Sequence, residues 1–267
     1  MKKSTLFALV LLIIGVGCCA VACGMGVGSS MQNDLHVPRF LQYNETATDK
    51  GLDNHMQIER LVLDIDGAEC TVNTDCNESS LTGGDSVTWT LENGTLTVKQ
   101  ELPSGWWWKS KAAPVTLNIQ DTAISYLDID VDAGTVSMDD LIVMQALTCT
   151  VDAGAAYLDN VDTNRMELDV DAGEIVHSGT TRGPIDLDCD AGSIELTLND
   201  SSIGQVTGKV DLGSVDVSVD GKTAISRDGL SDTVNAKLPG TQGHDVLTFD
   251  CDAGSIEVKL TTEDISE

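Results

Sequence analysis

The sequence predicts an all-β protein: a single-domain β-solenoid or β-roll of about 20-residue rungs, preceded by one transmembrane helix. Three observations lead to this prediction. The tripeptide Asp-Ala-Gly recurs at a nearly constant interval, polar and apolar residues alternate on both sides of each copy, and an uncharged apolar run lies close to the N-terminus.

The repeat is marked by Asp-Ala-Gly, and Asp-Leu-Gly at residues 211–213 is a further copy with one substitution. Successive copies begin 20, 19, 19, 21 and 41 residues apart, so the last gap spans about two periods. Asp66-Gly67-Ala68 is an earlier, scrambled copy. The five full copies begin at Asp132, Asp152, Asp171, Asp190 and Asp252.

Each copy follows a short stretch in which apolar residues alternate with Asp, Glu or Thr. A period of two is typical of a half-buried strand. After the glycine a second alternating stretch begins, as at Val136 and Met138. The apolar positions before the copies are Leu127, Ile129, Val131; Leu147, Cys149, Val151; Met166, Leu168, Val170; Ile185, Leu187, Cys189; and Leu247, Phe249, Cys251.

A unit with two short strands cannot bury its apolar side alone, whereas stacked units can, with like strands paired in parallel about 4.8 Å apart. Each period is therefore expected to be strand, corner, strand and loop. We expect the corner glycines to supply a positive φ. These structural corners are Gly134, Gly154, Gly173, Gly192, Gly213 and Gly254.

The predicted domain covers residues 58–262, with a tail at 263–267. Residues 61–65 fit its first strand, and residues 86–91 and 95–98 flank Glu92-Asn93-Gly94, a strong hairpin signal. Residues 105–108, Gly-Trp-Trp-Trp, predict a loop, residues 115–119 a strand, and residues 220–245 a longer excursion before the last rung.

Residues 1–28 predict a short cytoplasmic end and a membrane anchor helix. The run from residue 6 to residue 27 carries no charge, and as a helix it would be about 33 Å long, enough for a bilayer core. Lys2 and Lys3 precede it, so the positive-inside rule places the rest of the chain outside. Residues 29–57 are polar and unpatterned, which predicts a juxtamembrane spacer.

Two alternatives to this single-pass anchor are open. The stretches that end at Cys18 and Cys23 loosely resemble a bacterial lipoprotein cleavage box, although neither has the usual Leu three residues before the cysteine. A cleaved signal peptide is the other alternative, with a shorter apolar region than this one.

The chain is strongly acidic, with 43 Asp and Glu against 15 Lys and Arg and a formal net charge of -28. This charge excludes a nucleic-acid binder held by phosphate contacts. An acidic surface attracts cations, so cations are candidate partners. Aromatic residues make up only 4%, which argues against a large aromatic ligand pocket.

The corner aspartates are the candidate metal ligands. Stacked about 5 Å apart, neighbours would repel by roughly 1 kcal/mol in water, and Ca²⁺ would relieve this repulsion. The local alternative is that each Asp accepts backbone N–H bonds, as in an Asx-turn. The corner column is always Asp, whereas neighbouring columns accept Thr and Lys, which favours the backbone role. The calcium ladder would comprise Asp132, Asp152, Asp171 and Asp190.

Histidine and cysteine give no site. The four histidines are scattered, and His177 falls on an inward position after its corner. Cys189 and Cys251 share a column, but in chain order the Asp211 rung lies between them, so packed thiols are expected. Cys70 and Cys76 are close enough in sequence to bridge.

An N-terminal membrane helix, an Asn-Gly-Thr-Leu-Thr-Val hairpin, a Trp-containing loop and repeated Asp-Ala-Gly corners ending in Asp-Ala-Gly-Ser-Ile-Glu-Val-Lys at 252–259 resemble the bacterial "putative adhesin", or toastrack-type, domain family. The resemblance covers roughly residues 58–262. It implies an extracytoplasmic β-solenoid, often attached to membrane segments and linked to envelope-stress sensing or surface interaction. It implies no catalytic residues.

The sequence therefore favours a membrane-anchored extracytoplasmic module for interaction, scaffolding or envelope-stress sensing, with a protein partner in the envelope and no cofactor. A calcium-dependent surface adhesin is the alternative. An enzyme acting on cell-wall polysaccharide is the second alternative, but the acidic residues repeat with the fold and single out no catalytic pair.

Overall fold

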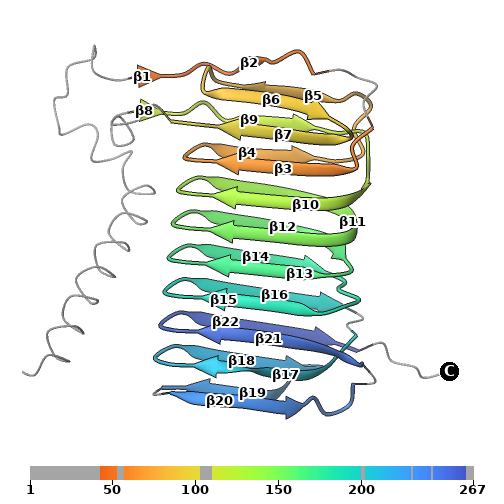
Figure 1. Cartoon of the computed structure of the whole chain (residues 1–267), viewed down its shortest axis with the longest axis vertical. Helices are drawn as coiled ribbons and strands as arrows, with labels where there is room; N and C mark the ends of the chain where they lie inside the picture. The colour runs from red at the N-terminus through yellow and green to blue at the C-terminus, as the bar shows by residue number, and fades with distance from the viewer. Residues whose placement is uncertain are drawn as a thin grey trace, which may run out of the picture. The chain divides into compact units, whose positions relative to one another are not determined.

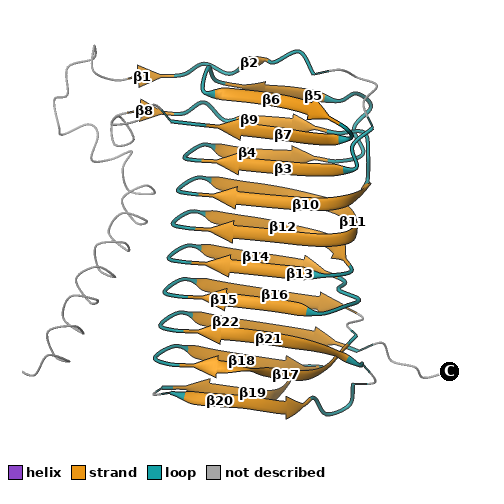
Figure 2. Ribbon diagram, in the orientation of Figure 1, coloured by secondary structure: helices purple, strands orange, loops and turns teal. Residues whose placement is uncertain are grey.

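The computed structural model describes residues 43–52, 57–102, 110–199, 202–229, 231–241 and 243–262. All secondary-structure elements in these residues are β-strands (Figure 2), so the all-β prediction is confirmed. This part of the chain contains no helix long and apolar enough to span a bilayer. The predicted anchor in residues 1–28 and the predicted loop at residues 105–108 lie outside the described residues.

Apart from Tyr43, the first residue of β1, the strands belong to a compact unit, Asn44–Glu267. In chain order they are β1 (Tyr43–Asn44), β2 (Thr48–Asp49), β3 (Arg60–Ile65), β4 (Glu69–Asn73), β5 (Ser80–Gly83), β6 (Val87–Glu92), β7 (Thr95–Gln100), β8 (Ser110–Lys111), β9 (Val115–Asn118), β10 (Ala123–Val131), β11 (Thr135–Val151), β12 (Ala155–Thr163), β13 (Met166–Val170), β14 (Glu174–Gly179), β15 (Ile185–Cys189), β16 (Ser193–Asn199), β17 (Ile203–Val210), β18 (Ser214–Val219), β19 (Lys222–Asp228), β20 (Asp232–Lys237), β21 (Asp245–Cys251) and β22 (Ser255–Thr261).

Two strands joined by a corner form one layer of the unit, which we call a rung. The strand before each corner pairs in parallel with its counterparts above and below, and the strand after the corner does the same on the other side (Figure 1). The strands before the corners form the first face and those after them the second. β11 is long because it belongs to both faces. Its first half pairs with β12 in the second face, and its second half pairs with β10 and β13 in the first face.

The core lies between the two faces and is built by alternation. In β10, Leu127, Ile129 and Val131 are buried, and the residues between them face outward. The register keeps like residues in columns, since Ile129 is level with Leu63 in β3 and with Cys149 in β11. Each rung therefore adds a layer of aliphatic side chains to one continuous core.

The rungs do not stack in chain order. β21 pairs with β15 on one side and with β17 on the other, so the last rung of the chain lies between the Asp190 rung and the Asp211 rung (Figure 1). The expectation that the Asp211 rung separates Cys189 from Cys251 is therefore wrong. Rungs pair through backbone N–H and C=O groups, which are nearly the same in every rung. The sequence repeat therefore identifies the rungs but does not determine the order in which they stack.

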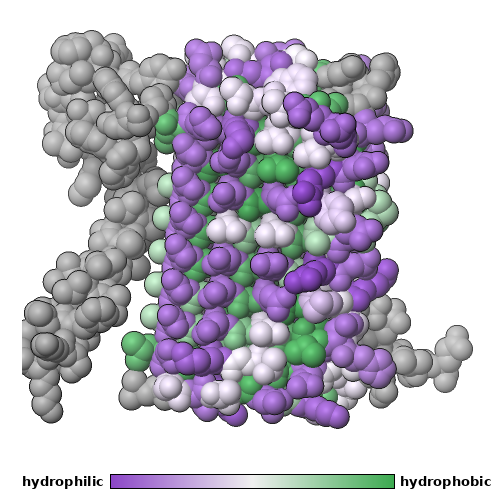
Figure 3. Space-filling view, in the orientation of Figure 1, coloured by the Kyte–Doolittle hydropathy of each residue, from purple (hydrophilic) through white to green (hydrophobic). Residues whose placement is uncertain are grey.

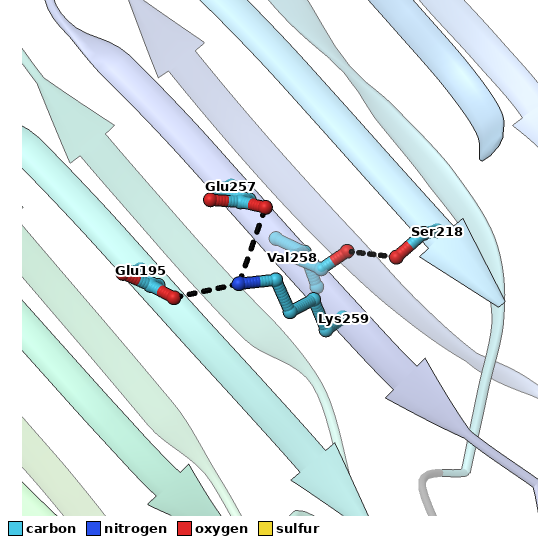
Figure 4. A network of polar contacts seen from close by, with 5 residues as sticks. All are labelled: Glu195, Ser218, Glu257, Val258 and Lys259. Atoms are coloured by element: carbon cyan, nitrogen blue, oxygen red, sulfur yellow. Dashed lines mark hydrogen bonds and ion pairs between the residues drawn. The ribbon is translucent and has the colours of Figure 1, made fainter. Parts of the chain in front are cut away.

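Polar contacts on the second face join the inserted rung to both neighbours (Figure 4). Lys259 of β22 forms ion pairs with Glu195 of β16, at 2.7 Å, and with Glu257 of its own strand, at 3.2 Å. On the other side, the Ser218 hydroxyl of β18 donates to the Val258 carbonyl at 3.5 Å.

Antiparallel strands cover both ends of the parallel stack. At one end β6 pairs with β7 and β5 with β9, and at the other β20 pairs with β17 and β19 with β18. The hairpin between β6 and β7 is confirmed, and Asn93 and Gly94 both have positive φ, as a two-residue hairpin turn requires. β2 lies inside the predicted spacer but pairs with β5, so the fold begins before residue 58.

The corner glycines require a correction. None of the six predicted corners has a positive φ, although other glycines of the described chain do. The corners need glycine because successive rungs approach closely there. A Cβ on Gly154, Gly173 or Gly192 would lie less than 3.0 Å from the carbonyl oxygen of the corner glycine in the adjacent rung. The limit is therefore steric and comes from the neighbouring rung.

We expect Gly192→Ala to lower the free energy of unfolding by roughly 1–3 kcal/mol, because its methyl group would meet the Gly173 carbonyl and the Val170 side chain. The measurement is chemical denaturation. Thr150→Ala is the control: it lies on the outward side of the first face and should change stability by less than about 0.5 kcal/mol. Equal losses in the two variants would contradict the steric explanation.

Candidate functional site

The candidate site is the outward side of the first face, just before the corners. On each strand the corner Asp and the residue two positions earlier point outward on either side of a buried residue, as Asp130 and Asp132 do around Val131. In register, Asp130 is level with Asp64, Asp169 with Asp188, and Asp188 with Asp250. Figure 3 shows hydrophilic residues in columns over this face.

We call this surface the acidic face and define it by its outward carboxylates. Four positions before each corner, a third column adds further acidic residues. The members of the acidic face are Asp64, Asp66, Asp128, Asp130, Asp132, Asp152, Glu167, Asp169, Asp171, Asp186, Asp188, Asp190, Asp211, Asp250 and Asp252.

Backbone hydrogen bonds between rungs fix the spacing of the corner aspartates. The amide of Ala153 donates to the carbonyl of Asp132, that of Ala172 to Asp152, and that of Ala191 to Asp171, each at 2.8 Å. The parallel ladder therefore continues through the corner instead of ending at the strand. Successive corner carboxylates are held one strand spacing apart, about 4.8 Å.

The predicted Asx-turn role of the corner aspartates is wrong. In the described chain, no backbone amide donates a hydrogen bond to the carboxylate of Asp132, Asp152, Asp171 or Asp190. The reason is that corner amides already donate to carbonyls of the adjacent rung. These four carboxylates are instead exposed to solvent.

The first corner is different because the rung beside it has no matching corner. There the Gln100 side chain is fully buried, and its Oε1 accepts from the amides of Gly67 and Ala68, both at 2.9 Å. Asp66 also differs from the later corner aspartates, since its carboxylate accepts the amide of Leu102 at 2.8 Å. The sequence offered one signal for Gln100: a polar residue at an inward position of β7.

Five carboxylates of the acidic face have a raised pKa: those of Asp130, Asp132, Asp169, Asp188 and Asp190. Partial burial, and then the charges of Asp188 and Asp171, raise the pKa of Asp169. Burial followed by Asp66 and Asp152 raises the pKa of Asp132 in the same way. Like charges are therefore close enough to disfavour the ionised form of each other.

Basic residues lie at the ends and margin of the acidic face. Lys99 pairs with Asp64 at one end of the stack, and Lys209 pairs with Asp211 at the other. Both lysines occupy the column two positions before the corner, level with Asp64 and Asp250 respectively.

Two arginines bind the outermost column: Arg60 reaches Asp128 at 3.2 Å and Arg165 reaches Asp186 at 3.4 Å. Among the described residues, the other members of the acidic face form no ion pair. The uncompensated carboxylates are Asp66, Asp130, Asp132, Asp152, Glu167, Asp169, Asp171, Asp188, Asp190, Asp250 and Asp252.

The four aspartates of the predicted calcium ladder lie in one column of the acidic face. Their carboxylates lie on separate rungs and point outward, so no loop wraps around a common centre. In the described part of the chain, no group of three His, Cys, Asp or Glu residues is arranged to hold a metal ion.

His177 is buried in the core, at the inward position that the sequence predicted. Only 1% of the residue is exposed, and its Nε2 lies 2.9 Å from the Val161 carbonyl oxygen. Its Nδ1 has no hydrogen-bond partner among the described residues. Burial lowers the pKa of His177 to about 4. The ring is therefore neutral near pH 7 and has a structural position away from the acidic face.

The described cysteines are all free thiols. Cys149, Cys189 and Cys251 are fully buried, as expected. Cys70 is also buried. Cys76 lies in the loop after β4, where its thiol contacts the backbone carbonyls of Asn73 and Thr74.

The neutral His177 makes stability depend on pH. The unfolded chain takes up a proton near pH 6.5 and the native state only near pH 4, so the histidine contribution to stability is lost as pH falls through this range. The raised carboxylate pKa values act in the opposite sense. We therefore compare wild type with His177→Leu.

Relative to His177→Leu, the wild type should lose up to about 3 kcal/mol of unfolding free energy between pH 7 and pH 4. Urea denaturation across this range measures it. His244→Leu, at an exposed position, should follow the wild type. Parallel pH profiles for wild type and His177→Leu would refute a neutral buried ring.

The Toastrack DUF4097 family matches residues 66–266, and comparison with curated proteins gives no match. A solved "putative cell adhesion protein" from Clostridium sporogenes is 12% identical, with a TM-score of 0.35, and the match covers 81% of this chain and 99% of that one.

Two further solved structures are similar at the same low level. A "putative lipid binding protein" from Parabacteroides distasonis has 11% identity and a TM-score of 0.40, with 82% of this chain and 99% of that one covered. A "putative adhesin" from Bacteroides fragilis has 12% identity and a TM-score of 0.33, with 79% and 95% covered. Because the family match takes in most of the chain, the protein belongs to the Toastrack DUF4097 family.

Proposed function

We propose that this protein is a membrane-anchored, extracytoplasmic β-solenoid that acts as an interaction or scaffold module of the cell envelope, including a role in stress sensing. Its acidic face binds a cationic segment of a protein partner. The observation that carries the proposal is the row of uncompensated carboxylates held at fixed spacing by the corner ladder.

The charge arrangement supports binding rather than a purely structural role for these acids. The carboxylates of Asp132 and Asp169 make no hydrogen bond that stabilises the fold, and partial burial, followed by repulsion from neighbouring carboxylates, raises their pKa values. A surface of this kind lowers stability and gains favourable energy when a positively charged partner covers it. Lys99 and Lys209 neutralise only the ends of the acidic face.

The anchor part of the proposal rests on the uncharged run at residues 6–27 and on Lys2 and Lys3 before it. Attachment as a lipoprotein through Cys18 or Cys23 would place the domain on the same side of the membrane. We propose a binding function and no enzymatic one, because the carboxylates recur with each rung and form no distinct catalytic pair.

Binding to a short oligolysine peptide tests the acidic face, with the full chain held in detergent micelles. The test variant replaces four outward carboxylates of the column two positions before the corners with amides: Asp130→Asn, Asp169→Asn, Asp188→Asn and Asp250→Asn. We expect its affinity for oligolysine to fall roughly tenfold, because the removed charges lie in one column of the acidic face.

The matched control removes the same number of charges from exposed turns and strand ends: Glu78→Gln, Asp85→Asn, Glu92→Gln and Asp228→Asn. Both variants have the same net charge, so general electrostatic attraction is equal in them. The control should bind nearly as well as wild type. Equal losses in the two variants would show that the peptide senses net charge alone and would overturn the proposed binding face.

The calcium-dependent adhesin is the second candidate, and the stacked corner carboxylates are the observation that favours it. Thermal melts of the full chain in chelator, in NaCl and in CaCl₂ of equal ionic strength separate the two. We expect both salts to raise the melting temperature equally by screening repulsion. A saturable increase specific to calcium would instead indicate a bound ion and establish the adhesin.

A further inference from the structure

Two buried thiols meet where the inserted rung contacts its neighbour. Cys189 is the last residue of β15 and Cys251 the last residue of β21, and the register makes them direct partners on adjacent parallel strands. Both are fully buried, point into the core and are free thiols in the structure. The rung order alone brings them together, since 62 residues separate them along the chain.

The separation of their backbones suits a covalent link. Adjacent parallel strands are about 4.8 Å apart, within the range of Cα separations that disulfides span, about 4.4–6.8 Å. Each thiol contacts a backbone carbonyl one rung further on, Cys189 that of Ser255 at 3.9 Å and Cys251 that of Ser214 at 3.8 Å. Both sulfurs lie on the same side, each directed toward the corner glycine of the next rung, Gly254 for Cys189 and Gly213 for Cys251.

No other pair of described cysteines has this arrangement. Cys149 is level with Ile129 and Leu168. Cys70 is level with Val136 and Val115. The cysteine pair is therefore confined to the contact between β15 and β21, where a segment late in the chain is placed between two earlier ones.

We propose that Cys189 and Cys251 form a disulfide that fastens the inserted rung to β15 in the exported protein. The extracytoplasmic location in this inference rests on the proposed function. The bond would close a loop containing the Asp211 rung and the antiparallel strands β19 and β20. It would restrain the segment whose place in the stack departs from chain order.

The chemistry is thiol–disulfide exchange with an oxidant that is itself a disulfide. The thiolate of one cysteine attacks the oxidant, forms a mixed disulfide and releases one oxidant thiol. The second cysteine thiolate then attacks the sulfur of the first and releases the other. In total the two cysteines lose two protons and two electrons, and the oxidant disulfide is reduced to two thiols.

Exchange must take place before the rung closes. In the finished fold both thiols are inaccessible, and the neighbouring Cys251 thiol together with burial raises the pKa of Cys189. The test therefore starts from unfolded chain. Full-length reduced protein is refolded in detergent either with oxidised and reduced glutathione or with reductant alone. Peptide mapping after alkylation identifies the linked cysteines, and thermal melts follow.

We expect the glutathione sample to contain a peptide pair joined through Cys189 and Cys251, and to melt roughly 5–10 °C above the reduced sample. Cys251→Ala should abolish both the linked pair and the redox-dependent difference in melting temperature. Cys149→Ala, which changes a buried cysteine without a cysteine partner, should retain both. Separate alkylation of Cys189 and Cys251 after oxidative refolding would overturn the proposal.

The same mapping on protein taken directly from cells, alkylated before lysis, separates this inference from the proposed function. A linked pair in cells supports both. A link that forms on refolding but is missing in cells supports the disulfide site and overturns the extracytoplasmic location. A link that forms in neither sample overturns the disulfide site and leaves the acidic-face experiments as the test of function.

Discussion

The close contact between successive corners is the constraint on which the rest of this structure depends. The amide of Ala153 donates to the carbonyl of Asp132, and the same bond recurs one rung further on. This approach leaves no room for a Cβ on Gly154 or Gly173. Because the corner repeats at strand spacing, both faces stay in register, and aliphatic side chains inside and carboxylates outside fall into columns.

The same regularity produces an unfavourable surface. A ladder that places like residues at strand spacing concentrates charge when the outward residue is acidic. Partial burial, followed by the charge of a neighbouring Asp, raises the pKa values of Asp130 and Asp188. The described chain offsets this charge at the ends of the stack, through Lys99 and Lys209, and in the outermost column, through Arg60 and Arg165. A surface row of unpaired carboxylates at fixed spacing lowers the stability of the fold through repulsion, and the same row attracts cations.

The ends of the stack solve a second physical problem. A parallel ladder that simply stopped would leave open strand edges, which invite association with other chains. Here β6 and β20 cover the outermost parallel strands of the first face by antiparallel pairing and become the edge strands themselves. At the first corner, Gln100 supplies the acceptor that a neighbouring rung supplies elsewhere. The covering strands β19 and β20 precede the last rung along the chain, and β21 pairs inside the stack, between β15 and β17.

The sequence by itself determined the strands, the corners and the inward columns, because alternation and the Asp-Ala-Gly period are local properties of the chain. It identified the β6–β7 hairpin from Asn93 and Gly94, and it placed His177 inside. Only the tertiary structure decided that the Asp252 rung precedes the Asp211 rung in space, because interchangeable backbone edges carry no order. The role of the corner glycines was likewise decided between rungs, where a neighbouring carbonyl, and not φ, excludes a side chain.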